Sequence, residues 1–175
     1  MLHQGNRTYA IDPRQLAEAL ASSMPEPEFD TRMLPDEVLR VYEKGDRRVV
    51  ISYRKPQKTG IWLDGIDNAL HVPMPGLAIA RVTTDRFKRV SYSVVALKRR
   101  PQAGSKVYNA PLPNVGTNSV CWGTVPKPPI SVLMGADLSE DWANFLGSHF
   151  GSHATSQKSE EYPKDIRQLL REMHT

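Results

Sequence analysis

The chain has 175 residues, of which 39% are hydrophobic and 24% are charged, and this composition is typical of a single soluble globular domain. No apolar run reaches the roughly 18 residues of a membrane span, and the first residues hold no apolar stretch of signal-peptide length. One cysteine, Cys121, excludes an intramolecular disulfide and a paired-cysteine zinc site, so the reducing cytoplasm is the expected compartment.

The first predicted element is a short amphipathic helix over residues 13–23. Asp12 is a suitable N-cap, Pro13 fits the first helical position, and Gln15 completes a capping box. Two prolines within 24–31 end this helix, so that segment is predicted to be a linker.

Residues 34–97 change to a strand pattern. The stretch 34–42 fits either a helical turn or a strand. Short runs rich in β-branched residues, separated by turn residues, predict about four strands. These runs occupy residues 47–53, 61–63, 72–82 and 90–97. Such short connections favour an antiparallel meander over βαβ units.

Regular periodicity stops over residues 98–136, which hold several prolines and glycines and the single cysteine. A long irregular stretch inside a compact domain is more often functional than idle. Two further helices are predicted at 137–150 and 163–173 from their apolar spacing. The order of helix, strands, irregular segment and helices predicts an α+β fold.

Cys121 is the first candidate for chemistry, because a thiolate is a strong nucleophile that forms covalent acyl intermediates. The alternative is that this lone cysteine is a small buried hydrophobic residue. Asn114 lies seven residues earlier, and its amide can donate to a developing oxyanion. An asparagine after a proline is also a common turn residue, so both interpretations stay open.

His149 and His153 are four residues apart, a spacing that can place two metal ligands on one helix face. Gly151 between them disfavours a continuous helix, and no acid sits in a matching position. The sequence therefore predicts no metal site and no cofactor, and leaves the two histidines as candidate proton shuttles.

The net charge of +4 raises the case for an acidic partner such as nucleic acid. Two basic clusters are candidates for phosphate contacts, docking to an acidic protein surface, or ordinary solvated loop charge. The clusters are Arg86, Lys88 and Arg89, and Lys98, Arg99 and Arg100.

The segment LPNVGTNSVCW (112–122) resembles the active-site stretch of ubiquitin-conjugating enzymes. Pro113 and Asn114 match the Pro-Asn of a His-Pro-Asn tripeptide. Val120 matches the hydrophobic residue that follows it, and Cys121 matches the acceptor cysteine. Leu112 stands in place of the histidine, so the match is incomplete at that position.

A closer resemblance covers about residues 11–155 and is to the prokaryotic ubiquitin-conjugating-like family D, which includes a component of PRTRC systems. The matching blocks are RMLPDEVL, VPMPGLAIA, YSVVALKRRPQAGSKVYNAPLPNV, VCWG and WANFLGSHFGSH. The resemblance implies a ubiquitin-conjugating-enzyme-like fold. It gives one domain over 1–175, with its core at about 11–155 and a C-terminal helical extension at 156–175.

The resemblance also implies a pathway and a mechanism. The implied partners are a ubiquitin-like protein, a ThiF-like activating enzyme and a JAB-type isopeptidase, with no membrane involved. Cys121 would accept the C-terminal acyl group of the ubiquitin-like protein as a thioester and pass it to an amine. Helpers for the amine would be His149 or His153, or an acid after the cysteine such as Asp137, Glu140 or Asp141.

Two other functions remain open from the sequence. The same fold can serve as a non-catalytic adaptor that binds a ubiquitin-like protein or a mobile-element partner, in which case Cys121 is buried or dispensable. A nucleic-acid-binding component of a plasmid or phage-defence system is the third hypothesis, and it depends on the two basic clusters.

Overall fold

The structure is a computed structural model that describes two parts of the chain, each taken by itself. The larger part comprises residues 34–116, 119–123, 125–126, 128–156, 158 and 165–174. In the smaller part, two strands, β1 (Leu2–Gln4) and β2 (Arg7–Tyr9), pair in an antiparallel hairpin. The predicted helix at 13–23 lies outside the described residues.

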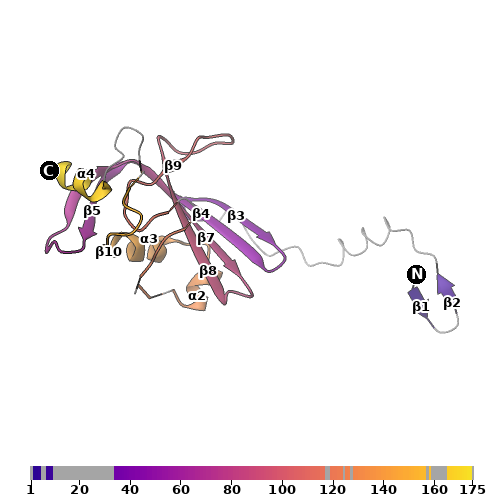
Figure 1. Cartoon of the computed structure of the whole chain (residues 1–175). Coiled ribbons are helices and arrows are strands. Elements are labelled where there is room, and N and C mark those ends of the chain that lie inside the picture. Colours follow the sequence, from indigo (N-terminus) through magenta and orange to yellow (C-terminus); the bar gives the residue numbers. More distant parts are fainter. Residues whose placement is uncertain are drawn as a thin grey trace. The chain divides into compact units, whose positions relative to one another are not determined.

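Five antiparallel strands form the main sheet, in the order β3-β4-β7-β8-β9 (Figure 1). The ambiguous stretch 34–42 contributes most of the first strand, which pairs with the second through a turn at Gly45. The strands are β3 (Val38–Lys44), β4 (Arg47–Arg54), β7 (Gly76–Thr84), β8 (Arg89–Leu97) and β9 (Tyr108–Asn109).

A second, three-stranded sheet interrupts the predicted meander. Its strands are β5 (Gln57–Leu63), β6 (Leu70–Met74) and β10 (His149–Phe150), in the order β10-β5-β6. The predicted strand at 61–63 therefore belongs to this sheet and not to the meander. The predicted strand at 72–82 is two strands, because Pro75 has no N–H to donate and separates β6 from β7.

Three helices follow the strands: α2 (Ile130–Met134), α3 (Ser139–Leu146) and α4 (Ile166–Glu172). The predicted helix at 137–150 ends early, at Gly147. A Cβ at this position would lie 2.8 Å from the carbonyl oxygen of Ala143. The C-cap conformation therefore needs a residue without a side chain, and glycine provides it. None of the helices in the described part of the chain has the length and apolar character needed to cross a bilayer.

The core lies between the main sheet and α3, which covers one face of that sheet (Figure 1). Strand alternation directs every second side chain to this face, as the buried Val50, Ile79 and Val94 show. On the helix, Trp142 and Phe145 are almost fully buried. The indole N–H of Trp142 donates to Ser52 Oγ at 3.0 Å, so its one polar atom is satisfied inside the core.

A buried ion pair crosses this core. Arg81 on β7 donates from Nη1 to Asp141 Oδ2 on α3 at 2.8 Å, and neither side chain is exposed to solvent. Tyr92 on β8 donates its hydroxyl to the other carboxylate oxygen of Asp141 at 2.5 Å. Burial, and then this hydrogen bond, hold the pKa of Tyr92 far above its ordinary value, so the hydroxyl remains a donor.

The same arginine also holds α2. Its Nη2 donates to the carbonyl oxygens of Gly135 at 2.5 Å and Leu133 at 3.4 Å, which lie at the C-terminal end of that helix. A guanidinium suits this position because its planar fork reaches several acceptors at once. Arg81 thus joins β7, α2 and α3 through a single side chain.

Removing one partner of the buried pair is predicted to destabilise the fold strongly. Asp141→Ala leaves the Arg81 guanidinium buried without its carboxylate, which costs about 3–5 kcal/mol. Urea unfolding followed by circular dichroism measures the loss. The matched control is Glu140→Ala, because this neighbouring acid on the same helix is exposed.

The double variant Arg81→Leu/Asp141→Leu separates a buried charge from lost packing. It is expected to recover part of the loss, since apolar replacement removes both buried charges together. Equal stability of the Asp141→Ala and Glu140→Ala variants would contradict a structural role for the pair.

Candidate functional site

Cys121 stands at the end of a short closed loop, and its thiol is exposed. Val115 and Val120 form an antiparallel bridge that closes the loop across its base. The backbone N–H of Cys121 donates to the carbonyl oxygen of Asn114 at 2.7 Å. The cysteine backbone is therefore fixed while its side chain faces solvent.

The loop is tied to the sheet through Tyr92. The N–H of Val120 donates to the carbonyl oxygen of Tyr92 at 3.1 Å. Trp122, directly after the cysteine, packs its ring against Tyr92 with a centroid separation of 4.7 Å and against Phe145 at 5.9 Å. Both residues beside Cys121 thus rest on the buried core.

A lysine from the C-terminal region contacts Val115, the residue that pairs with Val120 at the base of the loop. Lys158 Nζ donates to the carbonyl oxygen of Val115. Burial lowers the pKa of Lys158 below its ordinary value. Since Val115 pairs with Val120, this contact stabilises the loop close to the cysteine.

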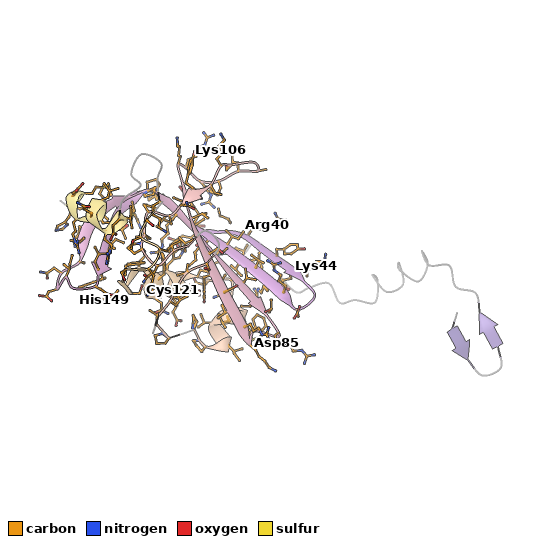
Figure 2. All side chains as sticks on the ribbon, viewed as in Figure 1. Arg40, Lys44, Asp85, Lys106, Cys121 and His149 are labelled. Atoms are coloured by element: carbon orange, nitrogen blue, oxygen red, sulfur yellow. The ribbon has the colours of Figure 1, made fainter. Side chains whose placement is uncertain are left out.

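The thiol opens into a pocket with a volume of about 610 Å³. The four site residues predicted from the sequence, which are Cys121, Asn114, His149 and His153, all line this pocket. Cys121 and His149 are labelled in Figure 2. Residues distant in the sequence therefore meet around one exposed thiol, and the walls include the half-buried Trp122 and Val125.

Asn114 has a structural role that the turn interpretation predicts. Its φ of 58° is in the left-handed region, which asparagine tolerates better than most residues. Its backbone N–H donates to the carbonyl oxygen of His153 at 2.7 Å. The side-chain Oδ1 is buried with no hydrogen-bond partner among the described residues.

Asp64 is a pocket residue that the sequence analysis missed. It follows β5, and its N–H donates to the carbonyl oxygen of Phe150 at 3.1 Å. Its Oδ1 lies 3.9 Å from His149 Nδ1. A Cβ on Gly151 would lie 3.0 Å from Asp64 Oδ2 and 3.7 Å from Asn114 Oδ1, so both oxygens lie close to this glycine.

The acids suggested as helpers from the sequence have other partners. Asp141 is buried with Arg81 and Tyr92. Asp137 accepts hydrogen bonds from Ser139 at the start of α3. Neither these two residues nor Glu140 lines the pocket. The sequence around Asp64, DGIDN, is an ordinary turn sequence and does not indicate a functional role. Asp64 lies at the pocket because β5, which precedes it, pairs in parallel with β10.

Comparison with known protein families shows which family the chain belongs to. Residues 13–175 match the family described as prokaryotic E2 family D. The chain belongs to this family. Membership assigns it a role related to ubiquitin-like conjugation, the reaction class in which E2 proteins take part. Comparison with curated proteins and with solved structures gave no match.

The two histidines of this E2-family chain do not share a helix. His149 lies in β10 and His153 in the turn that follows, because α3 ends before them. His149 packs its ring against Trp62 of the paired strand, with a centroid separation of 5.7 Å. Across the described ranges, no three histidine, cysteine or acidic side chains gather as a metal-binding group.

The cysteine loop is predicted to require a residue at position 114 that accepts a left-handed backbone conformation. Glycine accepts the left-handed conformation, whereas a β-branched residue is strained there by about 1–2 kcal/mol. Asn114→Gly is thus expected to unfold in urea close to wild type, and Asn114→Val at lower urea. If both variants lose the same stability, the side chain and not the conformation is what matters at this position.

Proposed function

We propose that this chain is a ubiquitin-like protein conjugating enzyme that carries an acyl group as a thioester on Cys121. One observation carries the proposal: the only cysteine is exposed at a pocket, on a loop whose backbone is anchored on both sides. A structural cysteine would be buried, as free cysteines usually are. The family match supports the same reading, with a ubiquitin-conjugating-enzyme-like fold for the domain.

The charging step is a thioester exchange. The Cys121 thiolate attacks the carbonyl carbon of a ubiquitin-like C-terminus held as a thioester on a ThiF-like activating enzyme. The new C–S bond forms as the old one breaks, and the activating enzyme's cysteine leaves as a thiolate that takes up a proton. Exchange between two thioesters is nearly balanced in free energy, so positioning is the main requirement.

The transfer step delivers the acyl group to a primary amine, with a lysine side chain as the proposed acceptor. The amine nitrogen attacks the thioester carbonyl, a C–N bond forms, and Cys121 leaves as a thiolate. Asp64 is exposed at the pocket, where its carboxylate can accept a hydrogen bond from an incoming ammonium group. His149 is near Asp64 and is suited to take the proton that the amine loses.

Asn114 has two proposed roles. Its left-handed backbone shapes the loop, and its carbonyl oxygen accepts from the N–H of Cys121. Its side-chain Oδ1 is buried, so Nδ2 is the atom that can donate to a developing oxyanion. We assign JAB-type isopeptidase action to a separate protein of the pathway.

A non-catalytic adaptor is the competing function, and the exposed thiol is the observation that disfavours it. Nucleic-acid binding through the two basic clusters has less support. The clusters lie at opposite ends of β8, because Arg89 begins that strand and Lys98 follows its last residue, Leu97. Eight steps of about 3.4 Å separate these ends, so the clusters do not form one patch.

Thioester carriage is tested by intact-protein mass spectrometry. The full chain is mixed with ATP, the ubiquitin-like protein and the activating enzyme of its own conjugation system. We expect wild type to gain one ubiquitin-like mass that thiol reductant removes. Cys121→Ser should give either a thiol-resistant ester or no adduct, because an oxygen ester is not cleaved by thiols.

The thioester-loaded protein also tests the transfer step. The Asp64→Asn variant should form its thioester normally but transfer the acyl group to free lysine about 10²-fold more slowly, because it lacks the carboxylate that accepts from the amine. Asp67→Asn is the matched control, since Asp67 is exposed in the same turn but does not line the pocket. If wild type gains no adduct while the activating enzyme carries its thioester, the conjugating function is contradicted and the adaptor function is favoured.

A further inference from the structure

One end of the main sheet gathers positive charge. The pairs Arg54–Leu77 and Gly76–Leu97 bring the end of β4, the start of β7 and the end of β8 to this position. The segment from 98 to 109 that follows contains no acidic residue. We call the cations at this place the sheet-end surface, and all except the half-buried Arg54 are exposed. They are Arg54, Lys55, Lys98, Arg99, Arg100 and Lys106.

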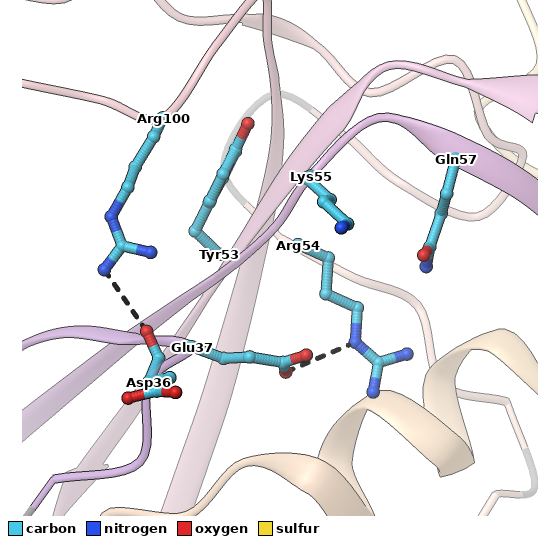
Figure 3. Close-up of a pocket in the computed structure, with 7 residues that line it drawn as sticks. All are labelled: Asp36, Glu37, Tyr53, Arg54, Lys55, Gln57 and Arg100. Carbon is cyan, nitrogen blue, oxygen red and sulfur yellow. Dashed lines mark hydrogen bonds and ion pairs between the residues drawn. The ribbon is translucent and has the colours of Figure 1, made fainter.

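A cavity of about 230 Å³ opens at the base of this surface (Figure 3). Arg54 is committed to other groups, because its Nε lies 3.5 Å from Glu37 Oε2 and its guanidinium lies 5.0 Å from the ring of Trp142. Arg100 donates from Nη2 to the backbone carbonyl of Asp36 at 3.2 Å. This contact positions the Arg100 guanidinium but leaves its charge without a carboxylate.

Lys55 and Arg100 are therefore the free charges of the cavity. Among the described residues, neither one forms an ion pair with a carboxylate. Both line the cavity, together with Tyr53 and Gln57. The cavity is lined by three cations, Arg54, Lys55 and Arg100, and by the two carboxylates of Asp36 and Glu37, so its net charge is positive and attracts an anionic group from outside the chain.

Two exposed apolar side chains, Val107 and Tyr108, belong to the segment that follows β8. Val107 is 59% exposed and Tyr108 is 44% exposed, although most residues of this size and polarity are covered. Lys98 Nζ lies 5.7 Å from the ring centroid of Tyr108. Figure 2 labels Lys106, which immediately precedes the two residues. Exposed aromatic residues are enriched at protein interfaces, and Tyr108 is one of them.

We propose that the sheet-end surface binds an acidic segment of a partner protein. Carboxylates of that segment pair with Lys55 and Arg100, and a neighbouring apolar side chain packs on Val107 and Tyr108. This inference goes beyond the proposed function, because it uses none of the residues that line the pocket at Cys121.

A protein segment fits this surface better than a nucleic acid does. The carboxylates of Asp36 and Glu37 also line the cavity, and they would face a continuous run of phosphates with the same charge. An acidic protein segment has separated charges and can avoid them. The exposed Val107 also has a use in a protein interface, where apolar burial adds to affinity.

Peptide selection on the full-length chain tests the proposal. A phage-displayed library of random peptides is the probe, and selected peptides are labelled for fluorescence anisotropy. Enriched sequences should combine Asp or Glu with an aliphatic or aromatic residue, and binding should weaken as salt is raised. The triple variant Lys55→Gln/Arg100→Gln/Lys106→Gln should bind them about tenfold more weakly or worse.

Two controls make the outcome decisive. Arg86→Gln/Lys88→Gln/Arg89→Gln removes the same charge from the opposite end of β8 and should leave peptide affinity unchanged. Cys121→Ser should also bind as wild type does, which separates this result from the outcome for the proposed function. Thermal unfolding of each variant verifies that the fold is retained.

The proposal is overturned if selection enriches no acidic peptides, or if the triple variant binds the selected peptides as tightly as wild type. A labelled single-stranded oligothymidylate provides the comparison with nucleic acid. Tight binding of this probe, lost in the triple variant and unmatched by any acidic peptide, would assign the surface to nucleic acid.

Discussion

The structure around the candidate site depends on one buried interaction, the Arg81–Asp141 pair with the Tyr92 hydroxyl bound to it. Two opposite charges without solvent contact are costly to bury, and hydrogen bonds from both Nη atoms of Arg81 offset part of that cost, whereas its Nε has no partner among the described residues. Here β7, β8, α2 and α3 each supply a group to the network. The four elements are thereby fixed relative to one another, because moving any of them leaves a buried charge or donor unpaired.

The position of the cysteine loop depends on this network through Tyr92. Tyr92 uses its hydroxyl to bind Asp141, its ring to contact Trp122, and its carbonyl oxygen to accept from Val120. One residue therefore connects the buried pair to both neighbours of Cys121. A rigid support beneath an exposed thiol is what an acyl carrier needs, since exchange between large partners depends on where the sulfur is presented.

The sequence located residues of the site better than the elements that bring them together. Local patterns indicated β4, β7 and β8 but not β9, and they left the stretch that forms β3 ambiguous. The motif around Cys121 led to Cys121 and Asn114, and the spacing of His149 and His153 led to the other two residues that line the pocket. Asp64 was missed because pairing between β5 and β10 joins residues more than eighty positions apart. Glu140, Asp137 and Asp141 were chosen for their closeness in sequence, but burial and hydrogen bonding direct Asp141 into the core. Spatial neighbours of this kind have no local signature.

The most direct test of the account is amide hydrogen exchange at the cysteine loop, measured by NMR in wild type and in Asp141→Asn. This substitution preserves the shape of the side chain but removes its charge. If the buried network supports the loop, the amides of Val120 and Cys121 exchange faster in the variant, while those of β6 in the other sheet keep their wild-type rates. Unchanged exchange at Val120 and Cys121, or the same acceleration in β6, would contradict a specific connection between the buried pair and the cysteine.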